Sequence, residues 1–236
     1  GRSMRGARGE PLPKQVYGHP WLLFGEDKMS KSRGNVIYAD DLVKRFGVDA
    51  VRYYLLSEMP HAADGSITYE TMIERFNSDL ANTLGNLVNR TIAMQNKYFG
   101  GVIQSSDCTE PLDDELKAAA AKAVADMDRY ISEYRIADAV DAVMSLARRS
   151  NKYIDETAPW VLAKDESTLP RLGTVLYNLL ECIRVIAVLI SPFMPDTSKS
   201  IFTQLNCDIN SYDSVKSFGR LKTGESVGTP VPLFSR

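Results

Sequence analysis

Hydrophobic residues in the middle of the chain recur at spacings of three and four, which is the period of an amphipathic α-helix. The longest such pattern predicts a helix over about 69–98, which Gly100-Gly101 ends. Its expected buried stripe contains Ile73, Phe76, Leu80, Leu84 and Leu87. Similar patterns predict further helices over about 112–134, 136–156, 172–189 and 196–205. We therefore expect a helical bundle.

The first sixty-eight residues have a different pattern. Residues 15–24 are aromatic and β-rich but interrupted by Pro20, so we expect one strand or two short ones. A polar, basic loop follows over 25–35. Short helices are predicted over 39–46, where Gly47 ends the first, and over about 49–58, and 64–66 has the composition of a turn. Because so little β structure is not stable alone, we expect it to be the end of a larger sheet domain.

Composition and charge narrow the class of protein. Hydrophobic residues make up 44% and charged residues 25%, which are ordinary values for a globular domain. The net charge is −2, so contact with a nucleic acid must be local and rely on stacking or shape. The longest apolar run, residues 185–190, is far too short to span a membrane. Three widely spaced cysteines fit neither a disulfide framework nor a zinc site, so we expect no metal and a reducing cytoplasm.

One motif in the basic loop points to chemistry. The run Lys28-Met29-Ser30-Lys31-Ser32, followed by Arg33-Gly34-Asn35, is identical to the KMSKS signature of class I aminoacyl-tRNA synthetases and has their typical continuation. Two lysines on a mobile loop can bind the phosphates of ATP as point charges and stabilise charge that develops at the α-phosphate. The resemblance implies that all five residues bind ATP and that Lys28 and Lys31 are catalytic. The alternative is a solvated basic turn.

The rest of the chain, from about 11 to 234, resembles the methionyl-tRNA synthetase family. Three features carry this resemblance: the run over 76–90, the triplet Ala158-Pro159-Trp160, and the order of loop, connecting helices, bundle and returning tail. The resemblance implies a mainly α fold. A helical-bundle anticodon-binding domain over 69–206 is preceded by a short β remnant of a nucleotide-binding domain within 1–34 and by connecting helices over 35–68. An extended tail over 207–236 follows.

Asparagines in the long predicted helix form a candidate RNA-binding line. Asn82, Asn86 and Arg90 are spaced by four residues and lie on one side of the helix, away from the apolar stripe, with Asn89 on the same outer side. Asparagine is a poor helix former, and amide and guanidinium groups can bind the base edges of unstacked RNA. The resemblance implies that Asn82, Asn86 and Arg90 contact the methionine anticodon. The alternative is that some of these asparagines pack against neighbouring helices.

Trp160 lies in a polar setting after Pro159. It is either a half-buried core residue or a platform on which a base stacks. The resemblance implies the second role, with Pro159 and Trp160 at the anticodon. Upstream, Arg148, Arg149 and Lys152 could contact phosphates or form an ordinary solvated helix face.

We therefore interpret the chain as the C-terminal portion of a methionine–tRNA ligase. Its implied partners are the methionine tRNA, methionine, and ATP with Mg²⁺ as substrate, with no membrane and no partner protein. The sequence lacks the His-Ile-Gly-His-type signature and the zinc-binding insertion of the family, so we expect this chain alone to be inactive. Three alternatives remain: a stand-alone anticodon-binding module, a helical interaction protein with a vestigial motif, and another class I synthetase for an aliphatic amino acid.

Overall fold

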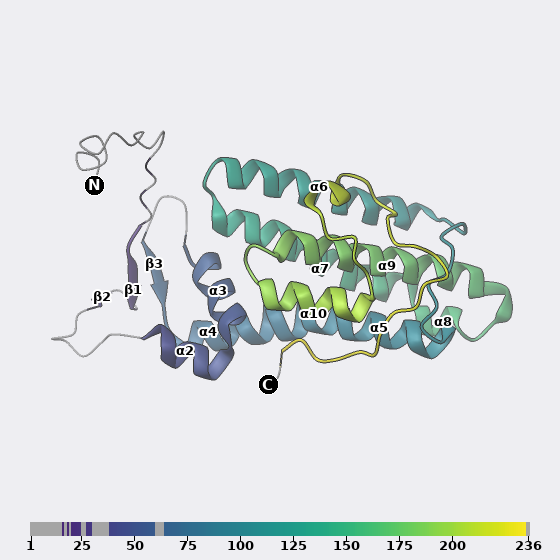
Figure 1. Cartoon of the computed structure of the whole chain (residues 1–236), viewed down its shortest axis with the longest axis horizontal. Coiled ribbons are helices and arrows are strands. Elements are labelled where there is room, and N and C mark those ends of the chain that lie inside the picture. Colours follow the sequence, from purple (N-terminus) through teal and green to yellow (C-terminus); the bar gives the residue numbers. More distant parts are fainter. Residues whose placement is uncertain are drawn as a thin grey trace.

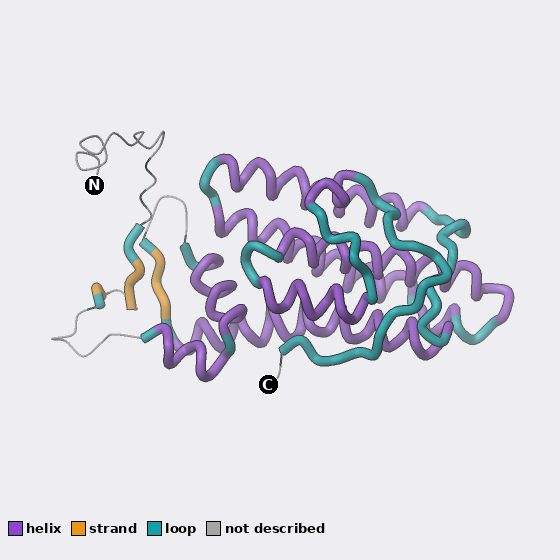
Figure 2. Tube along the Cα trace, in the orientation of Figure 1, coloured by secondary structure: helices purple, strands orange, loops and turns teal. Residues whose placement is uncertain are grey.

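A computed structural model describes residues 16, 18, 20–24, 27–29, 38–59 and 64–234. The described part is elongated, with a small sheet at one end and a long helical bundle at the other (Figure 1). Helices make up most of it, and strands occur only near the N-terminal end (Figure 2). The predicted mainly α fold is therefore confirmed.

The sheet has three short strands in the order β2-β1-β3 within the described part of the chain. Their bounds are Leu22–Phe24 for β1, Asp27–Lys28 for β2 and Gly65–Ile67 for β3. β1 pairs antiparallel with β2 and parallel with β3. The prediction of a turn at 64–66 was wrong, because residues 65 and 66 belong to β3. The partner of β3 lies more than forty residues earlier, so no local pattern indicates this pairing.

Two connecting helices follow the loop, namely α2 (Ala39–Phe46) and α3 (Val48–Ser57). The predicted end of α2 is confirmed: Gly47 has φ +82°, which glycine adopts without a steric penalty, and its N–H donates to the carbonyl of Val43. A second, smaller core holds these helices to the sheet. Its buried members are Leu42, Val51, Tyr54, Ile67 and Met72.

The long predicted helix is present, but its middle part is wider than an α-helix. It runs through α4 (Tyr69–Arg75), a π-helical segment η2 (Phe76–Gly85) and α5 (Asn86–Phe99) without a break. Thr68 begins it with a capping box, and Gly100 ends it in the left-handed conformation. Hydrogen bonds of the i→i+5 type put more residues into each turn, so the buried face shifts relative to an α-helical pattern.

This shift corrects one end of the predicted apolar stripe. Leu80, Leu84 and Leu87 are fully buried as expected. Ile73 is instead 48% exposed, and Met72 is buried in its place. The prediction counted the positions from 73 to 87 with the α-helical period. That period does not hold across η2, where each turn contains more residues.

The remaining helices form the bundle. The long ones are α6 (Pro111–Ser132), α7 (Ile136–Thr157), α9 (Leu169–Ile190) and α10 (Pro195–Leu205), and two short ones, α8 (Pro159–Leu162) and η3 (Glu166–Thr168), connect α7 to α9. α9 is the central helix, because α5, α6, α7 and α10 all pack against it. By length and composition the segment Glu166–Ile190 could cross a membrane, but its apolar window is completely buried inside the protein.

A buried ion pair on α9 holds the returning tail. Glu181 accepts two hydrogen bonds from Arg184, and its oxygens also accept the backbone N–H groups of residues 219, 220 and 221. Arg184 in turn donates to the hydroxyl and the carbonyl of Ser214, which lies in η4 (Tyr212–Lys216). Because a buried charge needs such partners, this pair fixes the first half of the tail on the bundle. Figure 1 shows the tail crossing the bundle and returning along α5.

A second buried network fixes the start of α6. The carboxylate of Asp113 accepts hydrogen bonds from both terminal nitrogens of Arg171, at 2.6 and 2.9 Å, and from the hydroxyl of Tyr153 at 2.5 Å. Burial opposes ionisation of Asp113, but the hydrogen bonds from Arg171, Tyr153 and the backbone N–H of Glu110 outweigh it. The pKa of Asp113 is therefore lowered below its usual value.

Candidate nucleic-acid interface

Three exposed amides share one side of the long helix. Asn82 near the end of η2 and Asn86 and Asn89 at the start of α5 are all exposed, and we call these three residues the asparagine strip. They line a groove of about 430 Å³ together with Ala81, Gly85 and three tail residues: Pro232, Leu233 and Phe234. We call this hollow the tail groove. One wall carries amides and the other is apolar, a combination that suits the edge and the face of a nucleobase.

Several hydrogen bonds bring the tail to this position. The side chain of Asn96 donates to the carbonyl of Gly228, and the amide of Gln204 both donates to and accepts from the backbone of Val231, each at 3.0 Å. At its end, Phe234 packs against Gly85, where an added Cβ would lie 3.3 Å from the phenyl ring. Sequence reasoning predicted an extended tail but not that the tail forms one wall of this groove.

α7 borders the asparagine strip on the other side. Its residue Asn151 donates to the carbonyl of Thr83 at 3.0 Å, and its residue Asp155 pairs with Arg90 at 3.7 Å. The structure thus brings Asn82 and Asn86 together in one groove, whereas Arg90 is half-buried and turned toward α7. Asn151 carried no sequence signal that marked it as part of this site.

The end of α7 presents an aromatic ring to solvent. Ala158 has a left-handed conformation with φ +43° and ends the helix, and buried Pro159 begins α8. Trp160 follows and is 44% exposed, and its neighbour Val161 is 53% exposed. A partly exposed indole held by a rigid turn is suited to stacking on a base.

The basic residues on α7 are already paired with carboxylates. Arg148 bonds Asp141, whereas Arg149 contacts both Glu115 and Glu156, the second of which also pairs with Lys152. Exposed pairs of this kind add little stability and are screened by salt. Because these positive charges are paired, the described part of this face mainly presents amides and an aromatic ring to a ligand.

The predicted ATP-binding loop is described only in part. The backbone of Lys28 lies in β2 opposite Leu23, and Met29 packs against the smaller core. Ser30, Lys31 and Ser32 lie outside the described residues. Among the residues that the structure describes, no group of three or more His, Cys, Asp or Glu side chains is arranged to hold a metal ion.

Comparison with known proteins shows the class to which this mainly helical fold belongs, the class I tRNA synthetases. Residues 103–236, more than half of the chain, match the anticodon binding domain of methionyl tRNA ligase, and residues 2–92 match the class I tRNA synthetases (M). The chain belongs to the methionyl tRNA ligase family.

Relatives and solved structures agree with this assignment. The chain is 51% identical over 230 residues to the methionine–tRNA ligase of Clostridium perfringens and 50% identical over 232 residues to that of Caldanaerobacter subterraneus subsp. tengcongensis. These alignments cover 98% of this chain but 36% of each relative, so the chain spans about a third of their length. The structure of Mycobacterium tuberculosis methionyl-tRNA synthetase in complex with methionyl-adenylate superimposes with a TM-score of 0.91 at 32% identity, covering 99% of this chain and 46% of that one.

Proposed function

We propose that this chain supplies the anticodon-binding part and the KMSKS loop of a methionine–tRNA ligase. Bases of the anticodon loop bind along the asparagine strip, where the amides of Asn82 and Asn86 bond base edges and Arg90 adds a third donor. Pro159 holds Trp160 so that its indole stacks on a base. The observation that carries this proposal is the tail groove, which places exposed amides opposite an apolar wall.

The rest of the proposal concerns the whole enzyme. The carboxylate of methionine attacks the α-phosphate of ATP, giving methionyl adenylate and pyrophosphate. A ribose hydroxyl of the terminal adenosine of the tRNA then attacks the carbonyl carbon of the adenylate, giving methionyl-tRNA and releasing AMP. Lys28 and Lys31 bind the phosphates of the Mg²⁺-bound ATP substrate and stabilise charge in the transition state, with Met29, Ser30 and Ser32 completing the loop. We place this activity in the cytoplasm. In this proposal the loop-bearing remnant is 1–34 and the connector is 35–68. The anticodon-binding bundle is 69–206, and the tail is 207–236.

A binding experiment with a short RNA tests the anticodon assignment. The probe is a hairpin whose loop carries the methionine anticodon CAU, and the comparison hairpin has its first anticodon base changed. Amide contacts to one base edge discriminate by about 1–3 kcal/mol, so the chain should prefer the CAU hairpin by about 5- to 150-fold. Equal affinity for the two hairpins would contradict the proposal.

Two variants show whether the asparagine strip carries that preference. Asn86→Ala should remove most of it, because the variant lacks an amide that faces the groove. Asn210→Ala is the matched control, since Asn210 is an exposed tail amide that does not line the tail groove. The control should keep the preference of the unmodified chain. An unchanged preference in Asn86→Ala would place the anticodon elsewhere.

A further inference from the structure

Asn151 contacts the long helix at the point where its hydrogen-bond register changes. Its side-chain amide donates to the carbonyl of Thr83 at 3.0 Å. The backbone N–H of Asn86 reaches the carbonyls of Ala81 and Thr83, which lie five and three residues back, rather than the carbonyl four residues back that an α-helix uses. The carbonyl of Thr83 therefore accepts from both Asn86 and Asn151 at the end of η2. Asn151 is bonded to the junction between the π-helical and α-helical parts.

A π-helical segment of this length needs support from its neighbours. Such helices are rare and mostly limited to single turns, whereas η2 extends over ten residues. Within η2 the hydroxyl of Thr83 donates to the carbonyl of Ser78, five residues back. Outside it, Phe234 packs against Gly85, and Asn151 bonds Thr83. Asn151 is thus a side chain from another helix that hydrogen-bonds the backbone of the wide segment.

The register at this junction sets the direction of the asparagine strip. Asn82 precedes Thr83 directly, and Asn86 is the first residue after η2. A return of η2 to the α-helical register changes the angle between successive side chains, so it turns Asn82 by tens of degrees relative to Asn86. Both amides would stay on the same broad side of the helix, but Asn82 would no longer meet the tail groove at the angle that it has beside Asn86. Their joint placement in the tail groove depends on the register that Asn151 contacts.

We propose that Asn151 is a positioning residue for anticodon binding: by fixing the junction at Thr83 it aims the amides of Asn82 and Asn86 at the same RNA. This inference rests on the proposed function of the asparagine strip. α7 also contacts the helix one turn further on, where Asp155 pairs with Arg90, so it holds the helix on both sides of Asn86. In the pair with Arg90 the carboxylate of Asp155 is 70% exposed and the N–O distance is 3.7 Å, which makes the shorter bond of Asn151 the stronger of the two constraints.

The bonding of Asn151 argues against a purely stabilising role. Its side-chain oxygen is buried and has no hydrogen-bond partner in the described part of the protein. A buried acceptor without a partner is unfavourable and offsets much of what the bond to Thr83 contributes. An apolar side chain of similar size would then preserve most of the stability while losing the bond that fixes the register.

The test compares two leucine variants of matched design. Asn151→Leu removes the bond to Thr83. Asn178→Leu is the control, because the amide of Asn178 also makes one bond, to the Tyr153 hydroxyl, and also has a buried oxygen without a partner in the described part, but it lies on α9. For each variant and for the unmodified chain, the affinities for the CAU hairpin and the first-base-changed hairpin are measured, together with the midpoint of thermal unfolding and the hydrogen exchange of the 81–86 amides.

We expect Asn151→Leu to reduce the preference for the CAU hairpin by roughly tenfold, because a tenfold change corresponds to the free energy of about one hydrogen bond. Exchange over 81–86 should become faster, whereas Asn178→Leu keeps both the preference and the exchange rates. If Asn151→Leu unfolds, Asn151→Ser replaces it and should show the same loss. The positioning role is overturned if a folded Asn151 variant keeps the preference of the unmodified chain, or if Asn178→Leu loses as much of that preference. Either result leaves the anticodon assignment intact. No preference in the unmodified chain overturns both.

Discussion

Asp49 and Arg52 lie one turn apart on α3 and bond the two sides of the corner between α9 and α10. A carboxylate oxygen of Asp49 accepts the backbone N–H of Thr197 at 2.6 Å, at the start of α10. The guanidinium of Arg52 donates to the carbonyls of Pro192 and Phe193, each at 2.8 Å, just after the end of α9. A negative group thus meets a helix N-terminus and a positive group meets a C-terminus, as the helix dipoles favour. The connecting helices are therefore fixed to the bundle.

We expect Asp49→Ala to loosen this joint. Loss of a capping carboxylate costs about 0.5–2 kcal/mol of the free energy of unfolding. Hydrogen exchange of the α3 amides should accelerate more than that of α9, because α9 is buried on all sides by the other helices. Uniform acceleration across both helices would show that Asp49 stabilises the whole domain and not the joint in particular.

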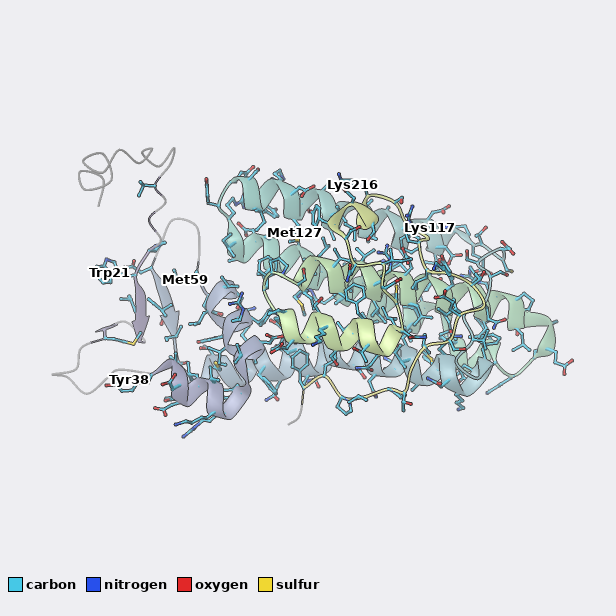
Figure 3. All side chains as sticks on the ribbon, in the orientation of Figure 1. Trp21, Tyr38, Met59, Lys117, Met127 and Lys216 are labelled. Atoms are coloured by element: carbon cyan, nitrogen blue, oxygen red, sulfur yellow. The ribbon has the colours of Figure 1, made fainter. Side chains whose placement is uncertain are left out.

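Replacing Trp160 should affect RNA binding more than stability. The ring is 44% exposed, so Trp160→Ala removes only part of a buried contact, whereas loss of a stacked base costs about 1–3 kcal/mol of binding. The affinity for the CAU hairpin should fall by about 5- to 150-fold. Trp21→Ala is the control, since Trp21 is also exposed but lies beside the sheet at the opposite end (Figure 3). A large drop in the unfolding midpoint of Trp160→Ala would instead place this residue in the core.

The buried carboxylate of Asp113 should make stability depend on pH. Its pKa is lowered in the folded protein, so its contribution is complete above the unfolded value of about 4 and is lost as the pH falls through the lower folded value. At pH 7, Asp113→Asn should cost about 3–5 kcal/mol, because the buried Arg171 loses its buried carboxylate and keeps only the exposed Glu110, at 3.4 Å, as a charged partner. Chemical denaturation should show this difference shrinking below about pH 4. A difference that stays constant down to pH 3 would contradict the ionised state of Asp113.

In a full-length enzyme, Lys31→Ala should slow adenylate formation. A charge contact that strengthens in the transition state is worth about 3–4 kcal/mol, which corresponds to a rate loss of about 100- to 1000-fold. Methionine binding should change little, because the lysine is assigned to the phosphates of ATP. Pyrophosphate exchange at saturating methionine measures the first effect, and its methionine dependence measures the second. Lost methionine affinity with an unchanged rate would refute the assigned role.

The helices were the most predictable part of the fold. Their limits depend on neighbours in the sequence: Gly47 ends α2 through its positive φ, and Gly100 ends α5 in the same way. β3 was not predicted because its partner strand is distant in sequence. The π-helical register of η2 also had no local signal, since the side chains that support it, Asn151 and Phe234, come from α7 and the tail.

The candidate site was predictable to the extent that it depends on one helix. The i, i+4 spacing placed Asn82 and Asn86 on the same side, and both line the tail groove. The spacing could not show that Arg90 turns toward Asp155, because that depends on where α7 packs. The apolar wall was also missed: its residues follow the strip by more than 140 positions, and buried Glu181 helps to bring the tail back.

The most direct test of the central claim is to map the RNA on the protein by NMR. On addition of the CAU hairpin, the side-chain amide signals of Asn82 and Asn86 and the indole N–H signal of Trp160 should shift most. A second groove on the molecule is lined by α6 and the η4 region and is bordered by Lys117 and Lys216, which lie on the upper side in Figure 3. Shifts confined to that groove, with the asparagine strip unchanged, would contradict the account.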